Sequence, residues 1–167
     1  YKDIGIDFGT VHMGSCNEFG AFCLSGSNTN SAFITIGTLF NNSNLTPGTF
    51  DFIAHELGHA FLFEFTRYSN IGNQTLHEGI ADIFGTYIES LIPINNGIDW
   101  VIGDDIPQVA STVNRNLQTT QFNCFQNVQT NTSPYTRGAP LGHWYFLASQ
   151  GDATRNIPAL GTLSALN

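Results

Sequence analysis

The sequence of 167 residues is 41% hydrophobic and 13% aromatic, which is enough for a packed core and argues against wholesale disorder. Thirteen acidic residues against five Lys and Arg give a net charge of −8, which would repel a phosphate backbone, so we expect no nucleic-acid partner. No apolar run approaches the roughly 18 residues that span a bilayer, so we expect no membrane partner either. Charged residues make up only 11% of the chain, and a surface of neutral polar groups is typical of secreted, extracellular proteins.

The first predicted element is a strand over 31–37, where β-branched residues alternate loosely with others. A turn-rich loop over 41–48 separates this strand from a helix in which apolar residues and histidines recur at helical spacing. Thr49 or Asp51 can cap the start of this helix, and the segment over 69–74 ends it.

A second amphipathic helix is predicted over 75–91, and it ends before Pro93 because the residue that precedes a proline disfavours helical geometry. Its predicted apolar face consists of Ile80, Ile83, Phe84, Tyr87, Ile88 and Leu91. The later predictions are an acidic loop over 99–105, a short helix over 109–117, a loop over 123–133 and a last helix over 141–150. One early strand followed by helices predicts an α+β fold.

Three cysteines allow at most one disulfide. Cys16 and Cys23 are seven residues apart, close enough for a small disulfide in an oxidising compartment, and Cys124 would then be a leftover buried thiol. Three unpaired cysteines are the alternative. The start at Tyr1 resembles a mature or trimmed end, which leaves a removed leader or pro-segment open.

The stretch from His55 to His59, with Glu56 beside the first histidine, carries the main chemical signal. Positions i and i+4 lie on one face of a helix, so both imidazoles can reach a single metal ion. Glu56 projects beside that ion and could hold a metal-bound water. Two partly exposed histidines and a glutamate on a helix surface are the alternative.

A second acidic pattern lies on the next helix, where Glu78 and Asp82 are again four residues apart. Both helices are amphipathic and able to pack together, which would bring Glu78 towards His55 and His59. Two imidazoles and one carboxylate form the ligand set of a catalytic zinc site, with a fourth position open for water. Asp82 would accept the distal N–H of a ligand imidazole and fix its tautomer. An acidic face in water is the alternative interpretation of Glu78 and Asp82.

These motifs resemble those of the thermolysin family of zinc metallopeptidases, and the similarity extends from about residue 31 to residue 151. The matching stretches are 54–60 (AHELGHA), 78–86 (EGIADIFGT), 99–106 (DWVIGDDI) and 147–151 (LASQG). The resemblance implies a thermolysin-like catalytic domain of the α+β class. Residues 1–68 would form an N-terminal lobe with an edge strand and the zinc-binding helix, and residues 69–167 a mainly helical C-terminal lobe. Fewer residues flank the motifs than in the family, so the chain would be a compact variant or a fragment.

By this resemblance the protein is a zinc endopeptidase in which His55, His59 and Glu78 bind Zn²⁺. Glu56 would be the general base that takes a proton from a zinc-bound water, and Asp82 would support His59. A peptide or protein would be the substrate, with a preference for an apolar residue after the cleaved bond, and we expect a monomer.

Calcium also follows from the resemblance, because Asp51, Glu89, Asp99 and Asp104 fall on family positions that ligate Ca²⁺ beside the active site. Such an oxygen-only ligand set suits a hard cation. Val101 replaces one expected acid, so one calcium ion is expected rather than a pair. An ordinary acidic surface patch is the alternative.

Substrate-binding residues are also implied by the resemblance. Asn30 and Ala32 belong to a stretch similar to the family's edge strand, whose backbone pairs with an extended peptide. Arg115, or alternatively Arg137, would bind a substrate carbonyl on the leaving side. Tyr68 would point its hydroxyl into the cleft, with packing within its loop as the alternative.

The sequence departs from the family at the residue that stabilises the oxyanion. Tyr135 stands where the family has a histidine, and a phenol can donate one hydrogen bond to a developing oxyanion. His143 is the competitor for this role if the alignment shifts. The departure leaves two other functions open: a zinc-stabilised binding or regulatory module with weak catalysis, or a metallo-aminopeptidase.

Overall fold

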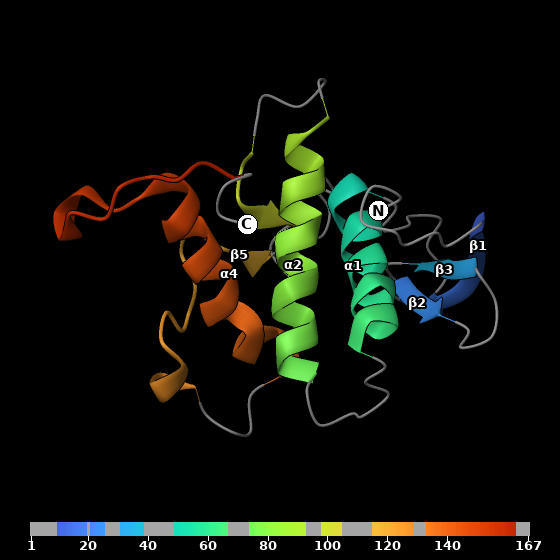
Figure 1. Cartoon of the computed structure of the whole chain (residues 1–167). Helices are drawn as coiled ribbons and strands as arrows, with labels where there is room; N and C mark the ends of the chain where they lie inside the picture. The colour runs from blue at the N-terminus through green and yellow to red at the C-terminus, as the bar shows by residue number, and fades with distance from the viewer. Residues whose placement is uncertain are drawn as a thin grey trace.

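The computed structural model describes residues 10–19, 21–25, 31–38, 49–66, 74–92, 98–104, 115–128 and 133–162. Among the predictions, the loop over 41–48, Asn30, Tyr68 and most of the short helix over 109–117 lie outside these residues. The described elements form an α+β arrangement of long helices with a small sheet beside them (Figure 1).

The N-terminal sheet consists of β1 (Thr10–Phe19), β2 (Ala21–Ser25) and β3 (Ser31–Thr38). β3 lies in the middle, parallel to β1 and antiparallel to β2. The predicted strand is therefore confirmed, whereas β1 and β2 were missed because small and polar residues interrupt their apolar alternation.

The strand order does not favour a disulfide between Cys16 of β1 and Cys23 of β2. β3 separates the two strands, so about 9.5 Å lies between backbones on either side of it. The Cα atoms of a disulfide usually lie within about 7 Å of each other. The third cysteine, Cys124, is exposed, which contradicts its prediction as a buried thiol.

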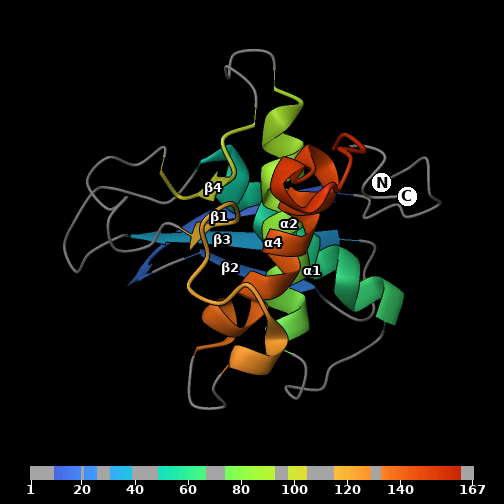
Figure 2. The same ribbon diagram turned by 90° about the vertical axis from the view of Figure 1, so that its left-hand side faces the viewer.

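The long helices are α1 (Phe50–Thr66), α2 (Gln74–Ser90) and α4 (Pro134–Gln150). Figure 1 shows α2 between α1 and α4, with the sheet on the far side of α1, and Figure 2 shows the same order from the side of α4. The first two helices agree with their predictions. In the part of the chain that the structure describes, no helix is long and apolar enough to cross a membrane.

The last helix begins seven residues earlier than predicted, at Pro134 rather than Leu141. The hydroxyl of Ser133 caps it by accepting a hydrogen bond from the Thr136 N–H at 3.3 Å, and proline is favoured in a first helical turn. Pro140 inside the helix made this segment resemble a loop. Tyr135 consequently lies on the first turn of α4 and not in a loop.

The contact between α2 and α4 depends on two glycines that face each other. A Cβ atom built on Gly138 would lie 2.8 Å from the backbone nitrogen of Gly79 and 2.9 Å from the carbonyl oxygen of Thr75. Only the absence of both side chains lets the backbones approach so closely. This contact brings the start of α4 next to Glu78, which directly precedes Gly79 on α2.

The main hydrophobic core lies where α2 and α4 meet a two-stranded sheet of β4 (Val101–Ile102) and β5 (Arg115–Asn116). Trp100 packs its ring against Tyr145 and Phe146 of α4, with centroid distances of 5.6 and 5.2 Å. The buried members of this core are Ile83, Trp100, Ile102, Leu117 and Tyr145. The strand at Arg115 contradicts the C-terminal end of the predicted helix over 109–117.

The buried face of α2 differs from its predicted apolar face. Leu91 follows the helix and is 58% exposed, whereas two acids, Asp82 and Glu89, are buried on α2 together with small residues. Ile83 is the member of the predicted face that is fully buried. The helix therefore presents carboxylates to the protein interior, which is costly unless they have partners.

Candidate metal centre

Two histidines of α1 and one glutamate of α2 converge on a single point. Nε2 of His55 lies 3.1 Å from Nε2 of His59 and 3.3 Å from Oε2 of Glu78. The third distance, from His59 Nε2 to the same oxygen of Glu78, is 3.5 Å. Among the described residues, these three form the only cluster of three or more His, Cys, Asp or Glu side chains that could hold a metal ion.

The convergence follows from local geometry. His55 and His59 are one helical turn apart, and α1 packs along α2, where Gly58 leaves room for Ala81: a Cβ atom at Gly58 would lie 3.0 Å from the Ala81 Cα. This close packing places Glu78, three residues before Ala81, opposite the two imidazoles. Oε2 of Glu78 is buried, and among the described residues its polar contacts are the two imidazole nitrogens. A buried carboxylate oxygen needs a partner, and a bound cation would supply one.

Asp82 lies directly behind His55, on the side away from the centre. Nδ1 of His55 donates to Oδ1 of Asp82 at 2.8 Å, which leaves Nε2 of His55 facing the centre. The prediction that Asp82 supports His59 is therefore wrong in its partner. Asp82 is one helical turn after Glu78, and this places its carboxylate next to the histidine that lies deeper between the helices.

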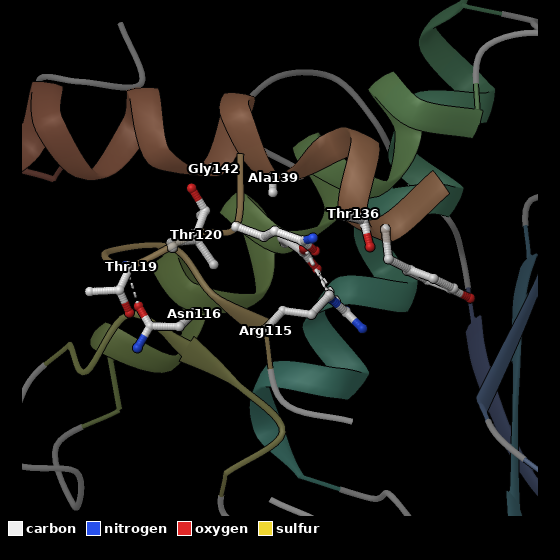
Figure 3. Close-up of a pocket in the computed structure, with 11 residues that line it drawn as sticks. Arg115, Asn116, Thr119, Thr120, Thr136, Ala139 and Gly142 are labelled. Carbon is white, nitrogen blue, oxygen red and sulfur yellow. Dashed lines mark hydrogen bonds and ion pairs between the residues drawn. The ribbon is translucent and has the colours of Figure 1, made fainter. Parts of the chain in front are cut away.

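Arg115 of β5 completes the arrangement. Its Nε and Nη2 donate to Asp82 at 3.0 and 2.7 Å (Figure 3). Nη2 also lies 3.3 Å from Nδ1 of His55, but that nitrogen carries the proton shared with Asp82, so this distance is a close contact rather than a hydrogen bond. Arg115 thus acts on the metal centre through Asp82, a role that its prediction as a carbonyl-binding residue did not include.

The ionisable groups of this cluster shift one another. Burial alone would lower the pKa of His55, but its contacts with Asp82 and Glu78 raise the pKa to about 9. Burial would raise the pKa of Glu78, but the two imidazoles lower it to about 2. For Asp82, burial is likewise outweighed, chiefly by the charge of Arg115, and the pKa is about 2. Both carboxylates are therefore ionised at neutral pH, and that of Glu78 is the one that faces the two imidazoles.

Glu56 and His77 flank the centre. Glu56 is buried on α1, at 8% exposure, between His55 and His59 in sequence. His77, directly before Glu78, stacks on His59 with ring centroids 6.2 Å apart and nearly parallel planes. Burial and the neighbouring His59 lower the pKa of His77. Sequence analysis missed this third imidazole because it lies outside the spacing of the motif.

Tyr135 lies beside Arg115, near enough to Glu78 to feel its charge. Its ring covers the guanidinium of Arg115 at 5.1 Å from the ring centroid, and the residue is 47% exposed. Burial first, and then the charges of Glu78 and Glu56, raise the pKa of its phenol. The hydroxyl therefore keeps its proton at neutral pH and can donate a hydrogen bond.

His143, the competitor of Tyr135, has a structural contact instead. Its Nδ1 lies 3.0 Å from the carbonyl oxygen of Leu117, and its ring stacks on Phe146 at 5.9 Å. It sits two helical turns after Tyr135 on α4. These contacts tie α4 to the segment that follows β5.

Ala32 does not lie at a sheet edge, which corrects the predicted pairing with substrate. It is on β3, where Val11 of β1 pairs with it on one side and Ser25 of β2 on the other. Both sides of the β3 backbone are therefore occupied by strands. An extended peptide would have to pair with β1 or β2 at the edges of this sheet.

The four predicted calcium ligands are not brought together as a cluster among the described residues. Asp51 is fully buried and accepts hydrogen bonds from the backbone N–H groups of Phe52 and Gly103, as well as from Thr49. The other three candidates are Glu89, which is 2% exposed, Asp104, which is partly buried, and Asp99, which is exposed. Asp51 thus connects the start of α1 to the turn after β4.

Comparisons with protein families, with curated proteins and with solved structures give no match for this chain. The resemblance to the thermolysin family therefore depends on the motifs quoted above. The geometry of the metal centre stands independently of that resemblance.

Proposed function

We propose that the protein is a zinc-dependent endopeptidase whose metal centre is His55, His59 and Glu78. The observation that carries this proposal is the spacing of the three donor atoms. Zinc bonds of about 2.0–2.1 Å in a tetrahedron require donors about 3.3 Å apart, and the three distances here are 3.1, 3.3 and 3.5 Å. Three protein ligands leave the fourth tetrahedral position for water or substrate, as in catalytic rather than structural zinc sites.

Zinc at such a site supplies Lewis acidity, which polarises a peptide carbonyl and makes water acidic enough to react near neutral pH. Glu56 is the group proposed to accept the proton of the attacking water and to pass it to the leaving amine. Its position one residue after a ligand on α1 supports that role. Tyr135 is proposed to donate its phenolic hydrogen bond to the oxyanion, supported by its raised pKa and its place beside the ligands.

Asp82 and Arg115 act as positioning residues in this proposal. The proton on His55 Nδ1 is held by Asp82, so that Nε2 keeps its lone pair for the metal. Arg115 neutralises Asp82 and lies under the Tyr135 ring. Secretion, a monomeric state and one calcium ion stay predictions alongside this function.

The proposal is tested by incubating the full chain with casein, with and without added zinc. We expect hydrolysis that a zinc chelator abolishes and zinc restores. Glu56→Gln should keep one zinc ion per chain, measured by elemental analysis, and lose at least about 100-fold in activity. A zinc-loaded wild type without hydrolysis would favour the binding-module alternative, and a fully active Glu56→Gln would exclude the assigned base.

A further inference from the structure

A pocket of about 320 Å³ opens beside the metal centre, between α4 and the segment that follows β5. Asp82, Arg115 and Tyr135 form the wall that it shares with the centre. In Figure 3, three of the labelled residues lie on α4, namely Thr136, Ala139 and Gly142, and the others come from the segment that begins at Arg115. Its volume is sufficient for one long amino-acid side chain.

The pocket has no net charge. Its charged lining residues are Asp82 and Arg115, and these are paired with each other at 2.7 Å. A carboxylate or ammonium entering the pocket would lose hydration without gaining an unpaired counter-charge. The remaining polar side chains that line it are neutral, namely Asn116, Thr119, Thr120, Gln121, Tyr135 and Thr136.

The neutral lining combines hydrogen-bonding groups with a short apolar wall. The hydroxyl of Thr120 donates to the carbonyl oxygen of Phe122 at 3.0 Å, so its oxygen is directed to act as an acceptor for other donors. Leu117, Ala139 and Gly142 supply apolar surface. A side chain with a methylene stem and an uncharged amide end matches both parts. A purely aliphatic side chain would displace water from the polar groups without replacing its hydrogen bonds.

We infer that this pocket receives an amide side chain, glutamine or asparagine, of a peptide bound at the metal centre. The inference rests on the proposed peptidase function for the identity of the ligand as a peptide. The pocket shares Asp82, Arg115 and Tyr135 with the surroundings of the metal centre, which places it within reach of a peptide bound there.

Peptide binding to the zinc-loaded Glu56→Gln chain tests the pocket without turnover. The probes are fluorescein-labelled peptides of alanine and glycine with one guest residue: Gln, Asn, Glu, Lys or Leu. Fluorescence anisotropy should give Gln and Asn peptides at least about tenfold tighter binding than the Glu, Lys and Leu peptides. Equal affinities, no saturable binding, or tightest binding of a charged or leucine peptide would overturn the inference.

Substitutions in the same background locate the preference. Ala139→Leu fills the pocket from α4 and should reduce the preference for Gln over Leu below twofold, whereas Gln150→Leu, at the exposed end of the same helix, should retain it. Thr120→Val keeps the side-chain volume, removes the hydroxyl and should raise the affinity of the Leu peptide relative to Gln. Full preference in both pocket variants would overturn the inference.

Hydrolysis of the Gln peptide by the wild-type chain is measured in parallel. Selective binding without hydrolysis would overturn the peptidase proposal and support the pocket as a binding site. Hydrolysis without selectivity among the guest residues would overturn the pocket inference and leave the peptidase proposal standing.

Discussion

Replacing Asp82 with asparagine tests how the ion pair behind the metal centre positions its ligands. Asp82 is 4% exposed and accepts from Arg115 Nη2 at 2.7 Å and from His55 Nδ1 at 2.8 Å. Although burial opposes ionisation, the charge of Arg115 and the contact with His55 hold the pKa of Asp82 at about 2, compared with its ordinary 3.8. That difference corresponds to about 2 kcal/mol of folding free energy. Because the folded pKa is the lower one, this stabilisation is present above pH 3.8 and is lost as the pH falls through 2.

At pH 7, Asp82→Asn leaves the partly buried Arg115 guanidinium without its counter-charge. We therefore expect the free energy of unfolding in EDTA to fall by about 3 kcal/mol, the lower end of the range for broken buried pairs. Zinc affinity should fall by about 10- to 100-fold, because the His55 imidazole loses the carboxylate that orients it. The exposed pair of Asp152 and Arg155, at 2.9 Å, offers a matched control.

Urea unfolding in EDTA measures the first effect, and titration of zinc against a competing chelator measures the second. Asp152→Asn should change neither by much, because solvent screens that pair. Zinc affinity of Asp82→Asn within twofold of the wild type would refute the positioning argument, as would equal losses in the two variants.

Three further predictions follow from the same geometry. The pKa of His55 is raised to about 9, so zinc must displace a proton from its ring when it binds the metal-free chain at neutral pH. Zinc affinity should therefore increase about tenfold per pH unit between pH 7 and 9. A pH-independent affinity, measured against a competing chelator, would contradict this. Tyr135→Phe should lower kcat at least about tenfold with little change in KM, and a larger kcat loss in His143→Ala would reverse the assignment of the oxyanion donor. Gly138→Ala places a Cβ atom 2.8 Å from the Gly79 nitrogen and should lower the free energy of unfolding by about 1–3 kcal/mol. Thermal denaturation measures this loss, and an unchanged melting temperature would contradict the close packing of the two helices.

The sequence predicted the parts of the metal centre that depend on local periodicity. His55 and His59 share a helix face because of their four-residue spacing, and amphipathic patterning was sufficient to bring Glu78 opposite them. The partner of Asp82 could not be predicted in the same way. Which of two imidazoles it contacts depends on the rotation of α2 against α1, which the one-dimensional pattern does not encode.

Features that depend on contacts distant in sequence were predicted less well. Arg115 approaches Asp82 from a strand 33 residues away, and no spacing rule connects the two. Ala32 was placed at a sheet edge because its own strand was recognised, but the strands on either side of it were not. Pro140 obscured the first half of α4 because interior prolines normally end helices.

The donors of the metal centre come from two different helices, two from α1 and one from α2. An ion held there is a cross-link between them, so the energy of metal capture is also energy of folding. With free zinc at about 1,000 times the dissociation constant, the folded state would gain about 4 kcal/mol. The melting temperature of this protein would then rise with the zinc concentration around it. Loss of the metal would make the chain itself more susceptible to proteolysis, in addition to stopping catalysis.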